Sequence, residues 1–127
     1  MVHMPDALTI LVVDDDALIS MSMVDMLEDL GHQVLEASSG AQALEIVKAA
    51  ERIDLVITDY SMPGMNGAEL AMGLRRIRND LPVLVATGYA DLPPDAGIDL
   101  PRLGKPYSQE QLAREISNIF SARNAEA

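Results

Sequence analysis

Five residues with chemically versatile side chains follow short apolar segments of this sequence. Asp14 and Asp15 follow the first segment, Asp59 follows a second, Thr87 follows a third, and Lys105 follows a short fourth. One aspartate in such a place is commonly no more than the first residue of a turn. Carboxylates, a hydroxyl and an ammonium group together, however, could neutralise and orient a phosphoryl group during its transfer. The sequence predicts that chemistry only if the fold brings these side chains together.

The aspartates are the clearest indication of a cation site. Asp14 and Asp15 come from one predicted strand and Asp59 from another, and like charges that meet repel each other unless a cation lies between them. Mg²⁺ takes oxygen ligands and keeps waters and a phosphate oxygen in its shell. The chain has no cysteine and no histidine near these positions, which disfavours zinc or copper. Helix capping accounts for Asp16, but not for acids that arrive from separate strands.

Apolar segments alternate with amphipathic segments along the chain. The apolar segments are too short for helices, which predicts buried strands, and the intervening segments place apolar residues at helical spacing. About five such alternations predict a single α/β domain with a doubly wound, five-stranded parallel sheet in the flavodoxin-like order 2-1-3-4-5. The carboxyl ends of the strands then meet at one edge. The predicted strands are residues 9–13, 33–37, 55–58, 82–86 and 102–103, and the predicted helices are about 17–30, 41–50, 67–79 and 108–121.

Helical spacing and proline content give further expectations. The first helix should turn Ile19 toward the sheet with Met23 and Leu27, and the third should place Arg78 on its solvated side. Three prolines between residues 88 and 101 predict a shortened fourth helix. We expect residues 1–7 to be disordered or derived from a tag, residues 8–121 to form the domain, and residues 122–127 to form a frayed tail.

The composition limits the possible partners and locations. The chain has 127 residues, of which 49% are hydrophobic but only 3% aromatic, so one largely aliphatic core is expected. Its net charge of −11 disfavours direct nucleic-acid or anionic-membrane binding and favours cations and basic partner surfaces. We expect no membrane insertion, because no apolar run approaches the roughly 18 residues of a membrane span. The lack of cysteine and of a recognisable signal peptide is consistent with a cytoplasmic location.

Four motifs, in this order and spacing, resemble the receiver domain of two-component response regulators. They are Leu11-Val-Val-Asp-Asp15, Asp54-Leu-Val-Ile-Thr-Asp59-Tyr-Ser-Met-Pro63-Gly-Met-Asn-Gly67, Thr87-Gly88 and Lys105-Pro106. The resemblance covers about residues 8–121. It implies that Asp59 accepts a phosphoryl group from the phosphohistidine of a histidine kinase or a histidine phosphotransfer protein. It also implies a signalling switch rather than an enzyme with a separate substrate.

The same resemblance assigns the surrounding residues. It implies that Mg²⁺ is bound by Asp15, Asp59 and the backbone carbonyl of Ser61, with Asp14 acting through water. Thr87 and Lys105 would contact the phosphoryl oxygens. Ser61 and Tyr89 would flank the path of attacking water and tune the lifetime of the phosphorylated state.

This sequence also departs from the family pattern. Arg102 occupies the position, three before the lysine, where the family often has a switch aromatic, and Tyr89 is the candidate replacement. The proline-rich segment stands where the family has a full fourth helix. The Ala86-Thr-Gly-Tyr-Ala90 segment resembles receivers of hybrid histidine kinases and of some stand-alone regulators, so the chain could be part of a longer hybrid kinase.

Two other functions fit part of the pattern. A haloacid-dehalogenase-type phosphatase would use Asp14 and Asp16 as its Asp-x-Asp pair, with Thr87 and Lys105, but it leaves Asp59 unexplained. A receiver that binds partners without being phosphorylated is the second alternative. His32 follows a glycine at a predicted helix end and is interpreted as a turn residue rather than as a phosphodonor.

Overall fold

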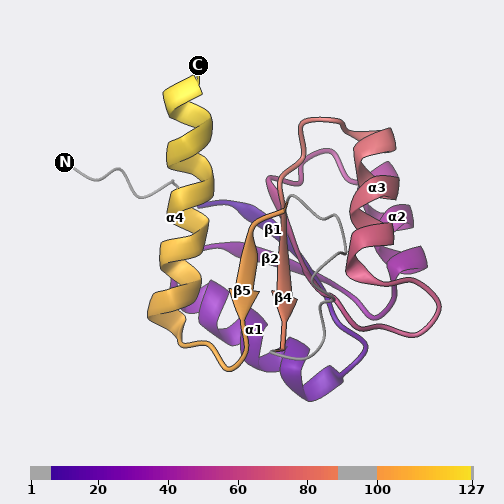
Figure 1. Ribbon diagram of the computed structural model, residues 1–127, viewed down its shortest axis with the longest axis horizontal. Coiled ribbons are helices and arrows are strands. Elements are labelled where there is room, and N and C mark those ends of the chain that lie inside the picture. The colour runs from indigo at the N-terminus through magenta and orange to yellow at the C-terminus, as the bar shows by residue number, and fades with distance from the viewer. Residues whose placement is uncertain (1–6, 89–99, 127) are drawn as a thin grey trace.

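The computed structural model describes residues 7–88 and 100–126, with the backbone alone for residues 122–126. Five parallel strands form one sheet in the order β2-β1-β3-β4-β5, which confirms the predicted fold (Figure 1). The predicted shortened fourth helix falls mainly in residues 89–99, outside the described residues. The elements are β1 (Thr9–Val13), α1 (Ala17–Asp29), β2 (Gln33–Ala37), α2 (Gly40–Ala49), β3 (Leu55–Asp59), α3 (Gly67–Ile77), β4 (Val83–Thr87), β5 (Arg102–Gly104) and α4 (Gln109–Glu126).

Helices cover both faces of the sheet. Helices α1 and α4 pack on one face and α2 and α3 on the other (Figure 1). All residues of β3 and β4 are buried, because a parallel strand between two helical layers has no solvent-facing side. Strand β2 lies at the sheet edge and is largely exposed. The neighbouring strands β1 and β3 lie inside the sheet and are almost wholly buried, so packing on both faces positions their carboxyl ends.

Capping residues fix where the helices begin. The Asp16 side chain accepts hydrogen bonds from the backbone N–H groups of Leu18 and Ile19, so Asp16 is the N-cap of α1, as the sequence predicted. Asn66 and Glu69 form a capping box at the start of α3. At the other end of the chain α4 extends to Glu126 and so includes residues 122–126 of the tail. Alanine, arginine and glutamate in this segment are strong helix formers.

The prediction that Ile19 faces the core is wrong. Ile19 is 37% exposed, and its neighbour Leu18 is 77% exposed. Both lie in the first turn of α1, beside the edge where the strands end, so no strand lies beneath them. The helical spacing of apolar residues therefore continues past the end of the sheet, and sequence periodicity alone cannot detect that end.

Arg78 was predicted to face solvent, but it joins two helices. Its guanidinium donates hydrogen bonds to the backbone carbonyl oxygens of Val47, at 3.0 Å, and Ala50 at the carboxyl end of α2. These carbonyls have no partner within their own helix, so the arginine satisfies groups that would otherwise need water. A cation at a helix carboxyl terminus is also favoured by the helix dipole.

We expect Arg78→Met to lower the free energy of unfolding by about 1–3 kcal/mol, because it removes charge-assisted hydrogen bonds and leaves carbonyl groups unpaired. Arg76→Met is the matched control, since Arg76 is exposed on the same helix. The control should change stability by no more than about 0.5 kcal/mol. Urea denaturation of the three proteins measures both values, and equal effects of the two substitutions would contradict the assigned role.

His32 is a structural acceptor at the start of β2. Its Nδ1 accepts a hydrogen bond from the backbone N–H of Leu8 at 3.1 Å, and burial lowers the pKa of His32 below its usual range. The folded protein therefore disfavours the protonated ring. Because the folded pKa lies below the unfolded value of about 6.5, this residue costs no stability above about pH 6.5 and destabilises the fold as the pH falls below it.

The pH dependence can be isolated with His32→Asn, because asparagine offers an acceptor oxygen but does not titrate. The unfolding free energy of the parent protein minus that of the variant should decrease from about pH 7 to about pH 5. Urea denaturation at each pH gives this difference, in which the other titrating groups cancel. A difference that stays constant with pH would show that His32 titrates alike in the folded and unfolded chains.

Candidate functional site

Three carboxylates meet at the carboxyl edge of the sheet. Asp14 and Asp15 follow β1, and Asp59 ends the neighbouring strand β3, whose Thr58 pairs with Val13. One carboxylate oxygen from each aspartate lies within 4.8 Å of the others. Asp14 and Asp59 are each only 7% exposed, whereas Asp15 is exposed. The fold therefore brings together the three acids that the sequence indicated.

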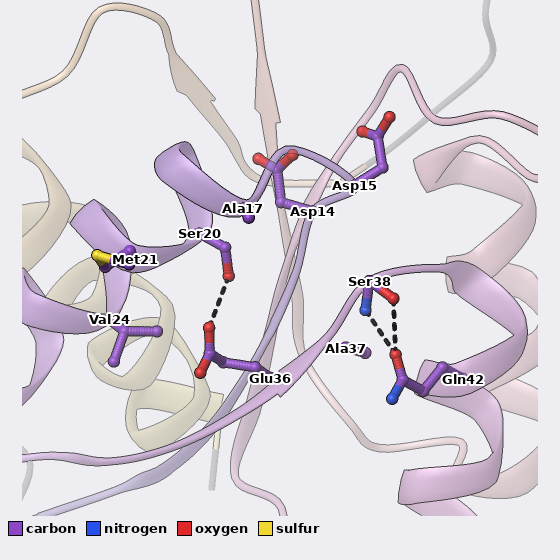
Figure 2. Close-up of a pocket in the computed structure, with 10 residues that line it drawn as sticks. All are labelled: Asp14, Asp15, Ala17, Ser20, Met21, Val24, Glu36, Ala37, Ser38 and Gln42. Carbon is purple, nitrogen blue, oxygen red and sulfur yellow. Dashed lines mark hydrogen bonds between the residues drawn. The ribbon is translucent and has the colours of Figure 1, made fainter.

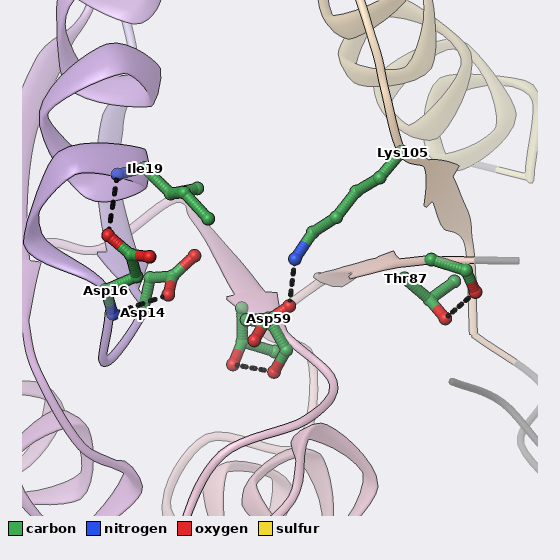
Figure 3. Close-up of polar contacts among 8 residues, drawn as sticks. Asp14, Asp16, Ile19, Asp59, Thr87 and Lys105 are labelled. Atoms are coloured by element: carbon green, nitrogen blue, oxygen red, sulfur yellow. Dashed lines mark hydrogen bonds and ion pairs between the residues drawn. The ribbon is translucent and has the colours of Figure 1, made fainter. Parts of the chain in front are cut away.

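Asp14 shows that negative charge is costly here. Burial is the main cause that raises the pKa of Asp14, and the charge of Asp59 raises it further, while a hydrogen bond from the backbone N–H of Asp16 lowers it. That hydrogen bond is 2.9 Å long and fixes the Asp14 carboxylate beside the site (Figure 3). The Asp16 carboxylate itself turns to the start of α1, so it does not join the three acids.

Lys105 follows β5, the edge strand opposite β2, and its side chain extends to Asp59. Its Nζ lies 2.5 Å from Oδ1 of Asp59, and this ion pair is partly buried (Figure 3). The backbone N–H of Lys105 donates to the carbonyl oxygen of Thr87, which fixes the start of the lysine against β4. One ammonium cannot neutralise three carboxylates, so the site retains excess negative charge when all three are ionised.

Thr87 ends β4, the strand next to β3, and is buried. Its hydroxyl donates a hydrogen bond to the Gly88 carbonyl oxygen at 3.0 Å rather than to Asp59 (Figure 3). Arg102 is exposed at the start of β5, and Ser61 is exposed in the loop between β3 and α3. Tyr89 lies outside the described residues. Of the expected site residues, the three acids and Lys105 lie close together. Asp59 pairs with Ala86 of β4, so Thr87 lies one residue beyond that pair.

Tyr107 is a neighbour of the site that we did not select from the sequence. Burial, followed by the charges of Asp14 and Asp59, raises the pKa of Tyr107, so its phenol stays neutral beside the acids. Its position directly after Lys105-Pro106 is the signal that could have identified it. Together with residues of α1 it lines an apolar groove, which we call the α1 groove. The groove is lined by Leu18, Ile19, Ser22, Met26, Lys105, Pro106 and Tyr107.

A second pocket lies on the β2 side of the site, and both polar and apolar side chains line it (Figure 2). Its polar side chains bond to one another: Ser20 donates to Glu36 at 3.0 Å, and the Gln42 amide oxygen accepts from both the backbone and the hydroxyl of Ser38. Asp14 and Asp15 line its end nearest the sheet edge.

The donor set suits a hard divalent cation. Carboxylate oxygens within 4.8 Å of one another match the oxygen ligands that Mg²⁺ or Ca²⁺ requires, and the described residues around them offer no thiolate or imidazole. Three carboxylates against the single ammonium of Lys105 indicate a deficit of positive charge. Asp14, Asp15 and Asp59 are therefore the residues that could hold a cation.

Comparisons with known proteins all identify the same family. The sequence profile of the response regulator receiver domain matches residues 10–117. Sensor kinase CckA from Brucella abortus is 34% identical over 123 residues, which are 91% of this chain but 13% of the kinase. Response regulator MprA from Mycolicibacterium vanbaalenii is 38% identical, with 87% of this chain covering 49% of that protein. Receiver protein CpdR from B. abortus is 34% identical, and the match covers 89% of this chain and 97% of CpdR.

Solved structures agree with the sequence matches. A response regulator receiver domain protein from Clostridium thermocellum superimposes with a TM-score of 0.83 at 30% identity, covering 94% of this chain and 99% of that one. The receiver domain of the hybrid histidine kinase CckA gives a TM-score of 0.73 at 32% identity, covering 87% of this chain and 96% of that one.

Among the residues that the structure describes, no helix combines the length and apolar character needed to cross a membrane.

Proposed function

Because this chain belongs to the response regulator receiver domain family, we propose that Asp59 accepts a phosphoryl group from a phosphohistidine and thereby switches a signalling pathway. The observation that supports this most directly is the Asp59 carboxylate, which lies 2.5 Å from the Lys105 ammonium and within 4.8 Å of two further carboxylates. A carboxylate that can act as a nucleophile, two carboxylates that could help to hold a cation, and a positive donor thus meet at one edge of the sheet, from three different strands. The family acts in two-component signalling and does not in general turn over a separate substrate.

In the proposed reaction an oxygen of Asp59 attacks the phosphorus atom of the phosphohistidine. The phosphorus–nitrogen bond breaks, an acyl phosphate bond forms, and the imidazole leaves with the electron pair and takes up a proton. Lys105 would move from the carboxylate to the incoming phosphoryl oxygens, and the Thr87 hydroxyl would rotate from Gly88 to donate to them. Mg²⁺ would be held by Asp15, Asp59 and the Ser61 carbonyl, with Asp14 acting through water. It would neutralise the negative charge of the carboxylates and the phosphoryl group that Lys105 and Thr87 do not neutralise.

The geometry favours this reaction over the phosphatase alternative. A haloacid-dehalogenase-type site needs Asp14 and Asp16 to work as a pair, but the Asp16 carboxylate caps α1 through Leu18 and Ile19. Asp59, which that alternative leaves without a role, is buried at the centre of the acid cluster. A binding module without phosphorylation would retain three mutually repelling carboxylates within 4.8 Å of one another at a cost to stability.

We also propose that the phosphoryl donor is a protein, either a histidine kinase or a histidine phosphotransfer protein. The α1 groove supports this, because it exposes Leu18 and Ile19 and is lined by the same Lys105 that contacts Asp59. A protein surface seated there would bring its phosphohistidine toward the acids. The match to CckA is consistent with a place in a longer hybrid kinase, and either arrangement is expected in the cytoplasm.

Mass spectrometry tests the proposed function. Incubated with acetyl phosphate and Mg²⁺, the protein should gain one phosphoryl group, and peptide mapping after borohydride reduction should place it on Asp59. Chelation of Mg²⁺ should prevent the gain. Labelling of a serine or histidine instead, or none under any of these conditions, would contradict the proposal.

A further inference from the structure

The loop of residues 60–66, between β3 and α3, stands beside the acid cluster and is anchored at both ends. The backbone N–H of Tyr60 donates to the Ala86 carbonyl oxygen at 3.0 Å, and the N–H of Gly67 donates to the Tyr60 carbonyl oxygen at 2.8 Å. Between these anchors, Met62 and Met65 pack on the buried cluster under α2 and α3 while Ser61 stays exposed. The loop is thus fixed by its methionines and presents Ser61 toward solvent.

Met65 lies directly against the backbone of α2. A Cβ atom added to Gly40, the first residue of α2, would lie 2.6 Å from Sδ of Met65 and 3.2 Å from its Cβ and Cγ. Gly40 is buried and does not have a positive φ, so backbone conformation does not require glycine there. A side chain at Gly40 would therefore require Met65 to shift.

The other end of the loop lies against the phosphoacceptor strand. A Cβ atom added to Gly67 would lie 2.9 Å from the carbonyl oxygen of Asp59 and 3.0 Å from the Cα atom of Tyr60. The Thr58 hydroxyl also donates to this Asp59 carbonyl oxygen at 2.9 Å. The loop is thus held between α2, through Met65, and the backbone of Asp59, through Gly67. A shift of Met65 would move the loop relative to Asp59.

We propose that Met65 is a positioning residue for the cation site, and this inference rests on the proposed function. By its contact with Gly40 it sets the distance of the Ser61 carbonyl from Asp15 and Asp59, and so the affinity for Mg²⁺. The chemical step itself needs no atom of Met65. Its loss should therefore weaken Mg²⁺ binding while leaving the phosphorylation rate at saturating Mg²⁺ close to that of the parent.

Four variants test this inference. We expect Met65→Ala and Gly40→Ala each to raise the Mg²⁺ concentration for half-maximal stabilisation against thermal unfolding by about 10-fold, as for residues that orient metal ligands, and to raise the midpoint for labelling by acetyl phosphate in parallel. Met65→Leu should restore nearly the parent value, because leucine fills a similar volume. The double variant Gly40→Ala/Met65→Ala should be no worse than Met65→Ala alone, because alanine at position 65 lacks the Sδ and Cγ atoms and leaves only its Cβ, at 3.2 Å, beside the added methyl group. Met72→Ala, at an exposed position of α3, is the control and should change nothing.

The Mg²⁺ midpoint separates positioning from stability. Met65→Ala that melts lower without metal but keeps the parent midpoint would overturn the inference, as would Gly40→Ala and Met65→Ala effects that add in the double variant. If Gly40→Ala does not fold, the comparison of Met65→Ala with Met65→Leu decides the matter. A parent protein that gains no phosphoryl group would instead overturn the proposed function, so the two failures are distinguishable.

Discussion

Asp59→Asn should abolish phosphoryl incorporation from acetyl phosphate, while the parent protein gains one group. Asparagine keeps the size of the side chain, so the sheet edge should stay folded, but an amide is a poor nucleophile and cannot form the acyl phosphate. The variant also removes the partner of Lys105, which lies 2.5 Å from the carboxylate in the parent. Intact-mass spectrometry at matched Mg²⁺ and donor concentrations measures the incorporation directly.

The matched control for this result is Asp16→Asn. Asp16 lies close in sequence to the site and carries the same charge, yet its carboxylate caps α1, and asparagine caps helices equally well. Asp16→Asn should therefore label like the parent protein. Labelling that survives Asp59→Asn but is lost in Asp16→Asn would support the phosphatase-type pair of Asp14 and Asp16 and refute the proposed acceptor.

The acid cluster could be predicted from the sequence because two simple rules determine it. Apolar segments with residues of high β propensity mark the strands, and parallel topology then brings every carboxyl end to one edge, so Asp14, Asp15 and Asp59 had to approach. Local rules predicted the capping role of Asp16 equally well. Where a residue's environment depends only on its own element and on strand order, the sequence is sufficient.

Contacts between separate helices were not predictable in this way. The partners of Arg78 lie 28 and 31 residues earlier in the chain, and its helical position alone indicated solvent. Ile19 follows the apolar spacing of α1 but lies at the end of the sheet, so the spacing misled. The contact of Met65 with Gly40 likewise depends on the packing of a loop on another helix. To predict such contacts one must know how the helices, strands and loops are placed relative to one another, and the periodicity of the sequence carries no information on that placement.

Asp15→Asn should remove the response of the protein to Mg²⁺. In the parent, Mg²⁺ at about one hundred times its dissociation constant should stabilise the fold by about 2.7 kcal/mol, because it binds only the folded site. Substitution of residues that merely orient ligands weakens metal binding by about 10- to 100-fold, and the loss of a direct ligand should cost at least as much. If binding is 100-fold weaker, the same Mg²⁺ concentration stabilises the variant by only about 0.4 kcal/mol, so it should melt at nearly the same temperature with and without Mg²⁺.

With Mg²⁺ the parent protein should be more stable than Asp15→Asn, and without metal Asp15→Asn should be the more stable of the two. Asp15, Asp14 and Asp59 then repel one another, so Asp15→Asn should melt above the parent, although by no more than about 1 kcal/mol of stability, because Asp15 is exposed and solvent screens its charge. Asp25→Asn is the control: it also changes the net charge from −11 to −10, but Asp25 lies on the exposed side of α1. Melting curves at constant ionic strength measure each protein with and without Mg²⁺. An Asp15→Asn variant that keeps the full Mg²⁺ response would place the cation elsewhere, whereas equal behaviour of the two variants would attribute the effect to net charge rather than to the acid cluster.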